Sequence, residues 1–214
     1  MLLIALLLLF LLHVFLADHP LTHYALPVFL LVILLANVHA LGDNKKVSLI
    51  ASMLGLAALA FRWMMYGSNS QALLLIGEGV GALFFAFTAV TILAIVLRAQ
   101  TVTGDIVSGA LCVYLLMGIM WAFLYMLLES VHPGTFRFAV ETKIAADTAY
   151  PPPAFLSRFV YFSFVTLSTV GYGDIVPLTG PARGLAVVEG ILGQFYLAVL
   201  VARFVSLYIV HSQR

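Results

Sequence analysis

The sequence has very little charge. Only 9% of its 214 residues are Asp, Glu, Lys or Arg, whereas 64% are hydrophobic, and the formal net charge is +1. Soluble globular domains carry about 25% charged residues, so this composition excludes an ordinary soluble fold and indicates an integral membrane protein. A nucleic-acid-binding protein needs a basic face to neutralise phosphates, which this charge balance does not supply. We therefore expect membrane lipid, and no nucleic acid, as a partner.

The sequence also lacks the residue clusters that catalysis and metal binding require. Its single cysteine, Cys112, lies inside an apolar run, so it can form no intrachain disulfide and we interpret it as a small buried hydrophobe. Among the histidines, His19 and His23 have helical spacing, but Pro20 falls between them. No nucleophile paired with a base and no phosphate-binding loop is recognisable. We predict that the protein is not an enzyme and has no cofactor.

Long apolar runs dominate what is present. A helix needs about 20 apolar residues to cross the hydrocarbon core, and six stretches approach or exceed that length. They are residues 2–17, 24–41, 47–66, 72–97, 106–128 and 183–210. The first could be the core of a signal peptide, but no basic residue precedes it and no small-residue cleavage pattern follows, so we expect a retained helix. The sequence predicts an all-α transmembrane fold of six membrane helices.

The connection between the fifth and sixth stretches, residues 129–182, is much longer than the others. Its polar first part ends in prolines at 151–153, which stop a helix. Residues 155–167 form an apolar run too short to cross a membrane but suited to a re-entrant helix, and the segment TLSTVGYGDIVP, residues 166–177, begins at its end. Non-helical backbone at membrane depth is tolerated only where it is packed in protein or lines a watery path.

The glycines of that segment have a chemical use. Gly171 and Gly173 can adopt backbone conformations with positive φ, and if such residues alternate with ordinary ones, successive carbonyls turn to the same side. A row of carbonyl oxygens is a ligand set for a hard cation. Thr169 adds a hydroxyl oxygen at the inner end of the row, and we expect the side chains of Val170 and Tyr172 to point into supporting protein.

The run Thr169-Val170-Gly171-Tyr172-Gly173, followed by Asp174, resembles the selectivity-filter signature of the potassium channels. The resemblance extends over about residues 106–210 and implies a pore domain at 106–214. Its parts are an outer helix at 106–128, an extracellular turret at 129–154, a pore helix at 155–168, the filter at 169–173 and an inner helix at 183–210. The resemblance also implies that potassium ions bind at Thr169, Val170, Gly171 and Tyr172.

Other residues acquire roles only through this resemblance. Tyr161 and Phe162 occupy the place of an aromatic pair that braces the filter, which would let the Tyr161 hydroxyl reach Asp174. Gly193 takes the place of the inner-helix gating hinge. Two alternatives stay open, because Tyr161 could be ordinary core packing and Gly193 could be a glycine that lets two helices approach closely. Val165 stands where some bacterial relatives carry a buried glutamate.

One filter segment can contact an ion from one side only, and the sequence contains a single filter segment. The resemblance therefore implies a homotetramer around a shared axis, acting as a passive potassium-selective channel. The resemblance places the filter at the outer side, so with six spans we expect both termini to be cytoplasmic and the protein to be a multi-pass protein of the cell membrane. The distribution of Lys and Arg does not decide the orientation.

Residues 1–105 are predicted to form a four-helix membrane domain that is not a voltage sensor. Each charge moved through the field contributes about 2.3 kcal/mol per 100 mV, so a sensor needs several basic residues along one helix. The fourth stretch has only Arg98, at its inner end. We expect an opening probability without steep voltage dependence.

Three acidic residues near or within the spans need partners or a function. We expect Glu78 to pair with Arg62, with a ligand or proton site as the alternative. Glu189 could accept hydrogen bonds from pore-helix hydroxyls such as Ser163, or sense pH. Glu129, at the outer mouth, is expected to be solvated.

Two other functions remain open at this stage. One is a less selective cation channel or a subunit of a potassium-uptake transporter. The other is a non-conducting membrane scaffold that modulates another channel.

Overall fold

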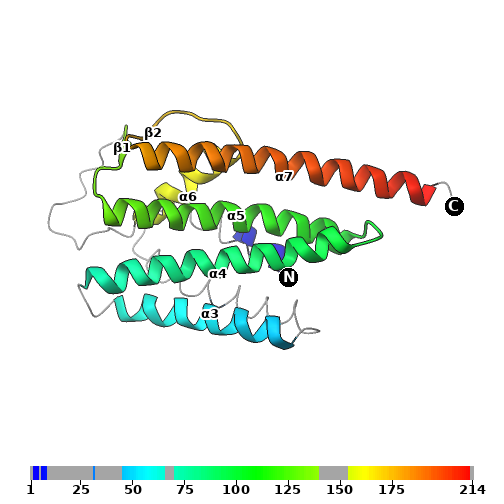
Figure 1. The fold of residues 1–214 in the computed structure, drawn as a ribbon, viewed down its shortest axis with the longest axis horizontal. Helices are drawn as coiled ribbons and strands as arrows, with labels where there is room; N and C mark the ends of the chain where they lie inside the picture. Colours follow the sequence, from blue (N-terminus) through cyan, green and yellow to red (C-terminus); the bar gives the residue numbers. More distant parts are fainter. Residues whose placement is uncertain are drawn as a thin grey trace.

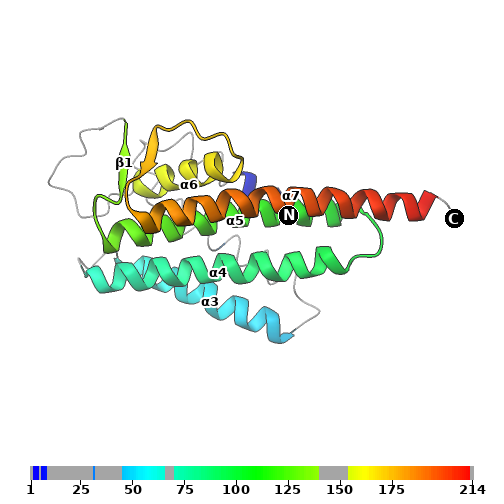
Figure 2. The ribbon, with the colours of Figure 1, turned by 45° about the horizontal axis from the view of Figure 1, so that its top comes forward.

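The computed structural model describes residues 2–4, 6–8, 31, 45–65, 70–139 and 154–212. Within them the elements are α3 (Lys45–Met65), α4 (Gln71–Arg98), α5 (Gly104–Val131), β1 (Phe136–Phe138), α6 (Ala154–Leu167), β2 (Ile175–Pro177) and α7 (Gly180–Ser212). The long helices α3, α4, α5 and α7 lie side by side, and the short helix α6 lies beside α5 and α7 near one end (Figures 1 and 2). The predicted spans at 2–17 and 24–41 fall largely outside the described residues.

Among the described residues, α4, α5 and α7 are long and apolar enough to cross a membrane. They match the predicted stretches but extend further. Helix α5 begins at Gly104 rather than at residue 106, and α7 begins at Gly180 rather than at residue 183. The start of α5 is explained by Thr103, whose hydroxyl accepts a hydrogen bond from the Ile106 N–H at 3.4 Å as an N-terminal cap. Counting apolar residues misses such polar helix ends. The predicted pore helix corresponds to α6, displaced by one residue.

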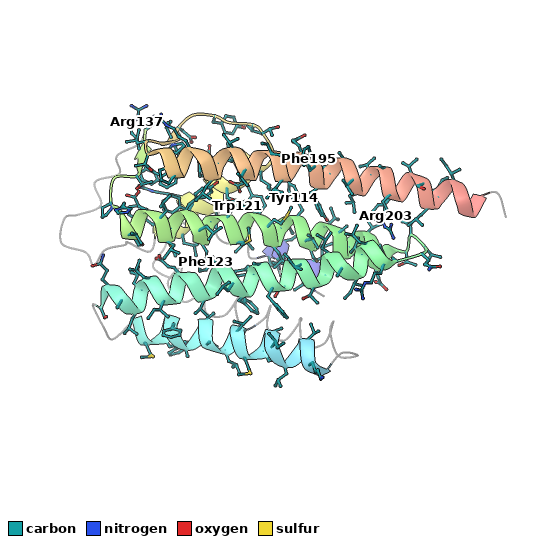
Figure 3. The ribbon with its side chains drawn as sticks, in the orientation of Figure 1. Tyr114, Trp121, Phe123, Arg137, Phe195 and Arg203 are labelled. Carbon is teal, nitrogen blue, oxygen red and sulfur yellow. The ribbon has the colours of Figure 1, made fainter. Side chains whose placement is uncertain are left out.

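The helix pair α4 and α5 is packed through aromatic side chains. Phe123 of α5 points towards α4 and is buried there (Figure 3). The centroid of its ring lies 5.4 Å from the centroid of the Phe85 ring. Gly81 makes this approach possible, because a Cβ atom at that position would lie 2.6 Å from Phe123 Cε1. Close packing of this kind, rather than exclusion of water, holds helices together in lipid.

A small antiparallel ribbon adds β-structure to a fold predicted as all-α. Strand β1 pairs with β2, with Arg137 opposite Val176. The ring of Phe136 packs edge-to-face on Tyr125 and Phe159, with centroid distances of 5.5 and 5.0 Å. Strands of three residues leave no periodic signal in a sequence, so the ribbon could not be predicted. It ties the segment after α5 to the segment that precedes α7.

Glu129 is buried rather than solvated, so the sequence-based expectation was wrong. Its side chain is 5% exposed at the end of α5. Oε1 accepts a hydrogen bond from the Gly134 N–H at 2.8 Å, and Oε2 accepts one from the Phe136 N–H at 3.0 Å. A carboxylate that pairs with two backbone amides can be buried because its oxygens are satisfied. Glu129 therefore fixes the turn that leads from α5 into β1.

Replacing Glu129 tests this role. Glu129→Ala leaves two amides without their acceptor, and each buried unsatisfied group costs about 1–3 kcal/mol. We expect a lower unfolding temperature in detergent, measured by tryptophan fluorescence. Glu129→Gln keeps one acceptor oxygen and should lose about half as much. Equal stability of the alanine variant and the wild-type protein would contradict the assignment.

Candidate cation site

The segment between α6 and β2 has an alternating backbone. Thr169, Gly171 and Gly173 have φ angles of 59°, 58° and 79°, so every second residue lies in the left-handed region. Gly134 is the other described residue with positive φ. Two of the three positions are glycine, for which this conformation is not penalised, whereas Thr169 bears a cost of about 1–2 kcal/mol. The backbone alternation that the two glycines predicted is therefore present, and it begins one step earlier, at Thr169.

The amides of this segment are held by α6. The N–H groups of Thr169 and Val170 donate to Thr166 O and Val165 O, both at 2.9 Å, and the Gly171 N–H donates to Val165 O at 3.3 Å. Within the described part of the chain, the carbonyls of 169–173 accept no backbone hydrogen bond. These oxygens are thus available to a cation or water, next to the negative end of the α6 dipole. The described ranges contain no cluster of three or more His, Cys, Asp or Glu that could hold a metal.

The described part of the chain does not supply the protein that was expected to support Val170 and Tyr172. Their side chains are 52% and 71% exposed. Helix α6 covers the amide side of the segment and leaves these two apolar groups uncovered. Any support for them comes from outside the described residues.

Asp174 terminates the segment and is held from several directions. The Tyr161 hydroxyl on α6 is hydrogen-bonded to the Asp174 carboxylate, and partial burial together with this bond raises the pKa of Tyr161 to about 12. The phenol therefore stays protonated, and remains a donor, at all pH values well below 12. The Ile175 N–H donates to Asp174 Oδ1 at 3.0 Å, and the Ala139 N–H donates to Asp174 O at 2.8 Å.

Phe162 does not pair with Tyr161 against the segment. It is buried, 6% exposed, and packs edge-to-face on Tyr125 and Phe136 with centroid distances of 5.0 and 5.4 Å. Adjacent residues of a helix point about 100° apart, so Tyr161 faces Asp174 while Phe162 faces the core. The contact between Tyr161 and Asp174 that the resemblance implied is present, whereas Phe162 is core packing.

Glu189 joins three helices. It is fully buried on α7, and its Oε2 accepts from the Tyr125 hydroxyl of α5 at 2.5 Å. Its Oε1 lies 2.5 Å from Ser163 Oγ of α6, which also lies 2.7 Å from Gly118 O. The predicted contact with Ser163 is confirmed. Nothing in the sequence pointed to Tyr125, because the two residues are 64 positions apart.

Glu78 is also buried, at 2% exposure, and its Oε1 accepts from Ser130 Oγ of α5 at 3.2 Å. The side chain of Arg62, its predicted partner, lies outside the described residues, so that pair stays a prediction. Glu78 links α4 to the last turn of α5, away from the segment 169–173.

Gly193 lies where α7 crosses the end of α6. Helix α7 continues through it without a break. A Cβ atom there would lie 2.4 Å from Leu167 O, so only glycine allows this approach. Close packing, the alternative left open by the sequence, accounts for the glycine. Its role as a gating hinge stays a prediction.

Two residues of α7 that sequence reasoning passed over make contacts with distant segments. Gln194 Nε2 donates to Thr169 Oγ1 at 3.4 Å. The Arg203 guanidinium donates through Nη2 to Ala99 O at 2.9 Å, beside the connection between α4 and α5 (Figure 3). An arginine inside an apolar run was the one available signal, since such a residue usually has a specific partner.

Substitution of two α7 glycines separates close packing from general loss of flexibility. Gly193→Ala forces its methyl group onto Leu167 O, and overpacking of this kind costs about 1–3 kcal/mol. Gly190→Ala is the matched control, because its Cβ would lie at an ordinary 3.7 Å from Thr166 O. We expect a lower unfolding temperature for Gly193→Ala only. Similar values for both variants would contradict the packing role.

The part of the chain that contains this segment is similar in sequence to known proteins. Residues 133–209 match the family model described as "Ion channel". The chain is 52% identical over 46 residues to "Two-pore potassium channel 4" of Arabidopsis thaliana. It is 34% identical over 92 residues to "Protein LctB" of Bacillus caldotenax and 35% identical over 85 residues to that of Geobacillus stearothermophilus.

These matches are partial on both sides. They cover 22%, 43% and 40% of this chain, and 16%, 64% and 59% of the respective relatives. No solved structure matches the chain. Helix α6, the segment 169–173 and most of α7 thus lie in a region similar to ion channels, in a chain with apolar helices able to cross a membrane.

Proposed function

We propose that this chain is a subunit of a potassium-selective channel and that the segment 169–173 of four copies forms its filter. The observation that supports this most strongly is the alternating φ of Thr169, Gly171 and Gly173. Such alternation turns successive carbonyls to the same side, while α6 holds the amides on the other. A row of carbonyls that replaces the hydration shell of a potassium ion works on this principle. The name of the Arabidopsis relative, a potassium channel, agrees with the same ion.

Assembly of four copies follows from coordination. Oxygens from one segment reach an ion from one side, and a bare cation needs them from all sides. The surfaces left uncovered support this assembly, since Val170 and Tyr172 are largely exposed. In α7 only 11% of the most apolar stretch is buried, compared with 44% in α4 and 56% in α5. Cyclic assembly around the ion axis would bring both features against neighbouring copies.

The proposed channel is passive and not strongly voltage-gated. The single basic residue of α4 is Arg98, in its last turn. One charge supplies about 2.3 kcal/mol per 100 mV, far less than steep voltage gating requires. The proposal includes six membrane spans with both termini in the cytoplasm.

Ion flux into liposomes tests the proposal. Purified protein should carry potassium faster than sodium by more than about tenfold, which corresponds to about 1.4 kcal/mol. Gly173→Ala should abolish this preference, because alanine resists a φ of 79° at a cost of about 1–2 kcal/mol in each copy.

Gly180→Ala is the matched control for this substitution. A Cβ atom meets nothing within 4 Å at either glycine, so the two differ in backbone conformation rather than space. The control should behave as wild-type protein. Equal flux of sodium and potassium would instead identify a less selective cation channel. Absence of flux under every condition would favour a non-conducting scaffold.

A further inference from the structure

The carboxamide of Gln194 lies beside the inner end of the proposed filter. Its Nε2 donates to Thr169 Oγ1 at 3.4 Å, although the two residues are 25 positions apart. Both side chains are exposed in the single chain, so they lie on its surface rather than in its core. Thr169 is the first residue of the alternating segment and its only hydroxyl-bearing member before Tyr172.

Backbone contacts on both sides determine this proximity. Gly193 brings α7 against Leu167 O, where a Cβ atom would lie only 2.4 Å away, so the next residue of α7 must lie near the end of α6. Thr169 is placed by its own N–H, which donates to Thr166 O at 2.9 Å. The two partners thus meet because their backbones are fixed close together, not because a long side chain happens to reach across.

The chemistry of the two groups is complementary. A threonine hydroxyl has one donor and two acceptor positions, and the amide N–H of Gln194 occupies one acceptor position. This restricts the rotation of the hydroxyl and leaves one lone pair for a cation. The same carboxamide has a carbonyl oxygen, Oε1, which accepts no hydrogen bond from the residues that the structure describes. A second uncharged oxygen donor, of the kind preferred by hard cations, therefore lies next to the first.

We propose that Gln194 and Thr169 together form a cation-binding site at the inner entrance of the filter, with Gln194 as a residue that determines affinity and selectivity there. In the assembled channel, four carboxamides would surround the entrance. Each orients the hydroxyl of Thr169 and adds an oxygen ligand. This inference rests on the proposed function, because it requires the segment 169–173 to surround an ion path.

Barium is a suitable probe of this site, because it is close to potassium in size and has twice the charge. Barium is added on the side of the membrane towards which α7 extends after Gln194. Its inhibition of potassium flux from that side reports the affinity of the inner site for barium. Gln194→Leu removes the amide with little change in volume. Hydrogen bonds to charged groups are worth about 1.5–3 kcal/mol, so we expect barium affinity to fall roughly tenfold to hundredfold. Gln194→Glu should raise it by at least about tenfold.

A double-mutant cycle tests whether Gln194 acts through Thr169. Thr169→Val removes the hydroxyl and keeps the side-chain shape. If the two groups form one site, Gln194→Leu should have a clearly smaller effect in the Thr169→Val background than alone. Additive effects would overturn the shared site. Gln194→Asn retains an amide that is one methylene shorter, and its barium affinity should lie between those of the wild-type and leucine proteins. It provides the same comparison if the leucine variant does not fold.

The outcomes separate this inference from the proposed function. If wild-type protein carries potassium selectively but Gln194→Leu and Gln194→Asn leave both barium affinity and the potassium-to-sodium ratio unchanged, the inner site is wrong and the channel stands. If wild-type protein carries no potassium, both are wrong.

Discussion

The central constraint is that three amides at the end of a short helix are tied back to it while the carbonyls that follow are left free. Thr169, Val170 and Gly171 donate to the last turn of α6, and positive φ at every second residue maintains the alternation up to Gly173. A conformation with a left-handed threonine is costly in isolation and persists only where its surroundings determine it. The rest of the protein provides these surroundings, because it fixes both ends of this segment.

The beginning of the segment is fixed through α6. Glu189 of α7 connects α6 to α5 and α7 by way of Ser163 and Tyr125, all out of contact with solvent. Four residues further along α7, on the same face, Gly193 contacts the last turn of α6. Removing one member of a buried network that joins a carboxylate to hydroxyls of two other helices lowers the stability of the fold, because the remaining polar groups are left without a hydrogen-bond partner. Helix α7 therefore positions the segment as well as flanking it.

The end of the segment is fixed through Asp174 and the ribbon. Tyr161 and two backbone amides hold Asp174, and the strand that follows it pairs with β1. Glu129 holds the backbone turn that leads into β1. A chain of contacts thus leads from the C-terminal end of α5 to the residue after Gly173. The segment is held in place at both ends, as a rigid ligand set requires.

Sequence reasoning reached features that are encoded locally. The glycines at 171 and 173 predicted alternation, and the apolar run at 155–167 predicted α6. The contact of Glu189 with Ser163, which joins two helices across 26 positions, was also anticipated. It could not find the ribbon, the burial of Glu129, the partnership of Glu189 with Tyr125, or the contacts of Gln194 and Arg203. The ribbon, the partnership with Tyr125 and the contact of Arg203 join segments far apart in sequence. Glu129 and Gln194 have partners nearer in sequence, but those contacts depend on a turn and on helix packing that leave no pattern in the residues.

The most direct test of the four-copy filter is a density map of the protein in lipid, with potassium replaced by rubidium to give an anomalous signal. A filter built as proposed predicts anomalous peaks on a four-fold axis, each surrounded by carbonyl oxygens of residues 169–172. Segments held apart from one another, with no ion density between them, would contradict it.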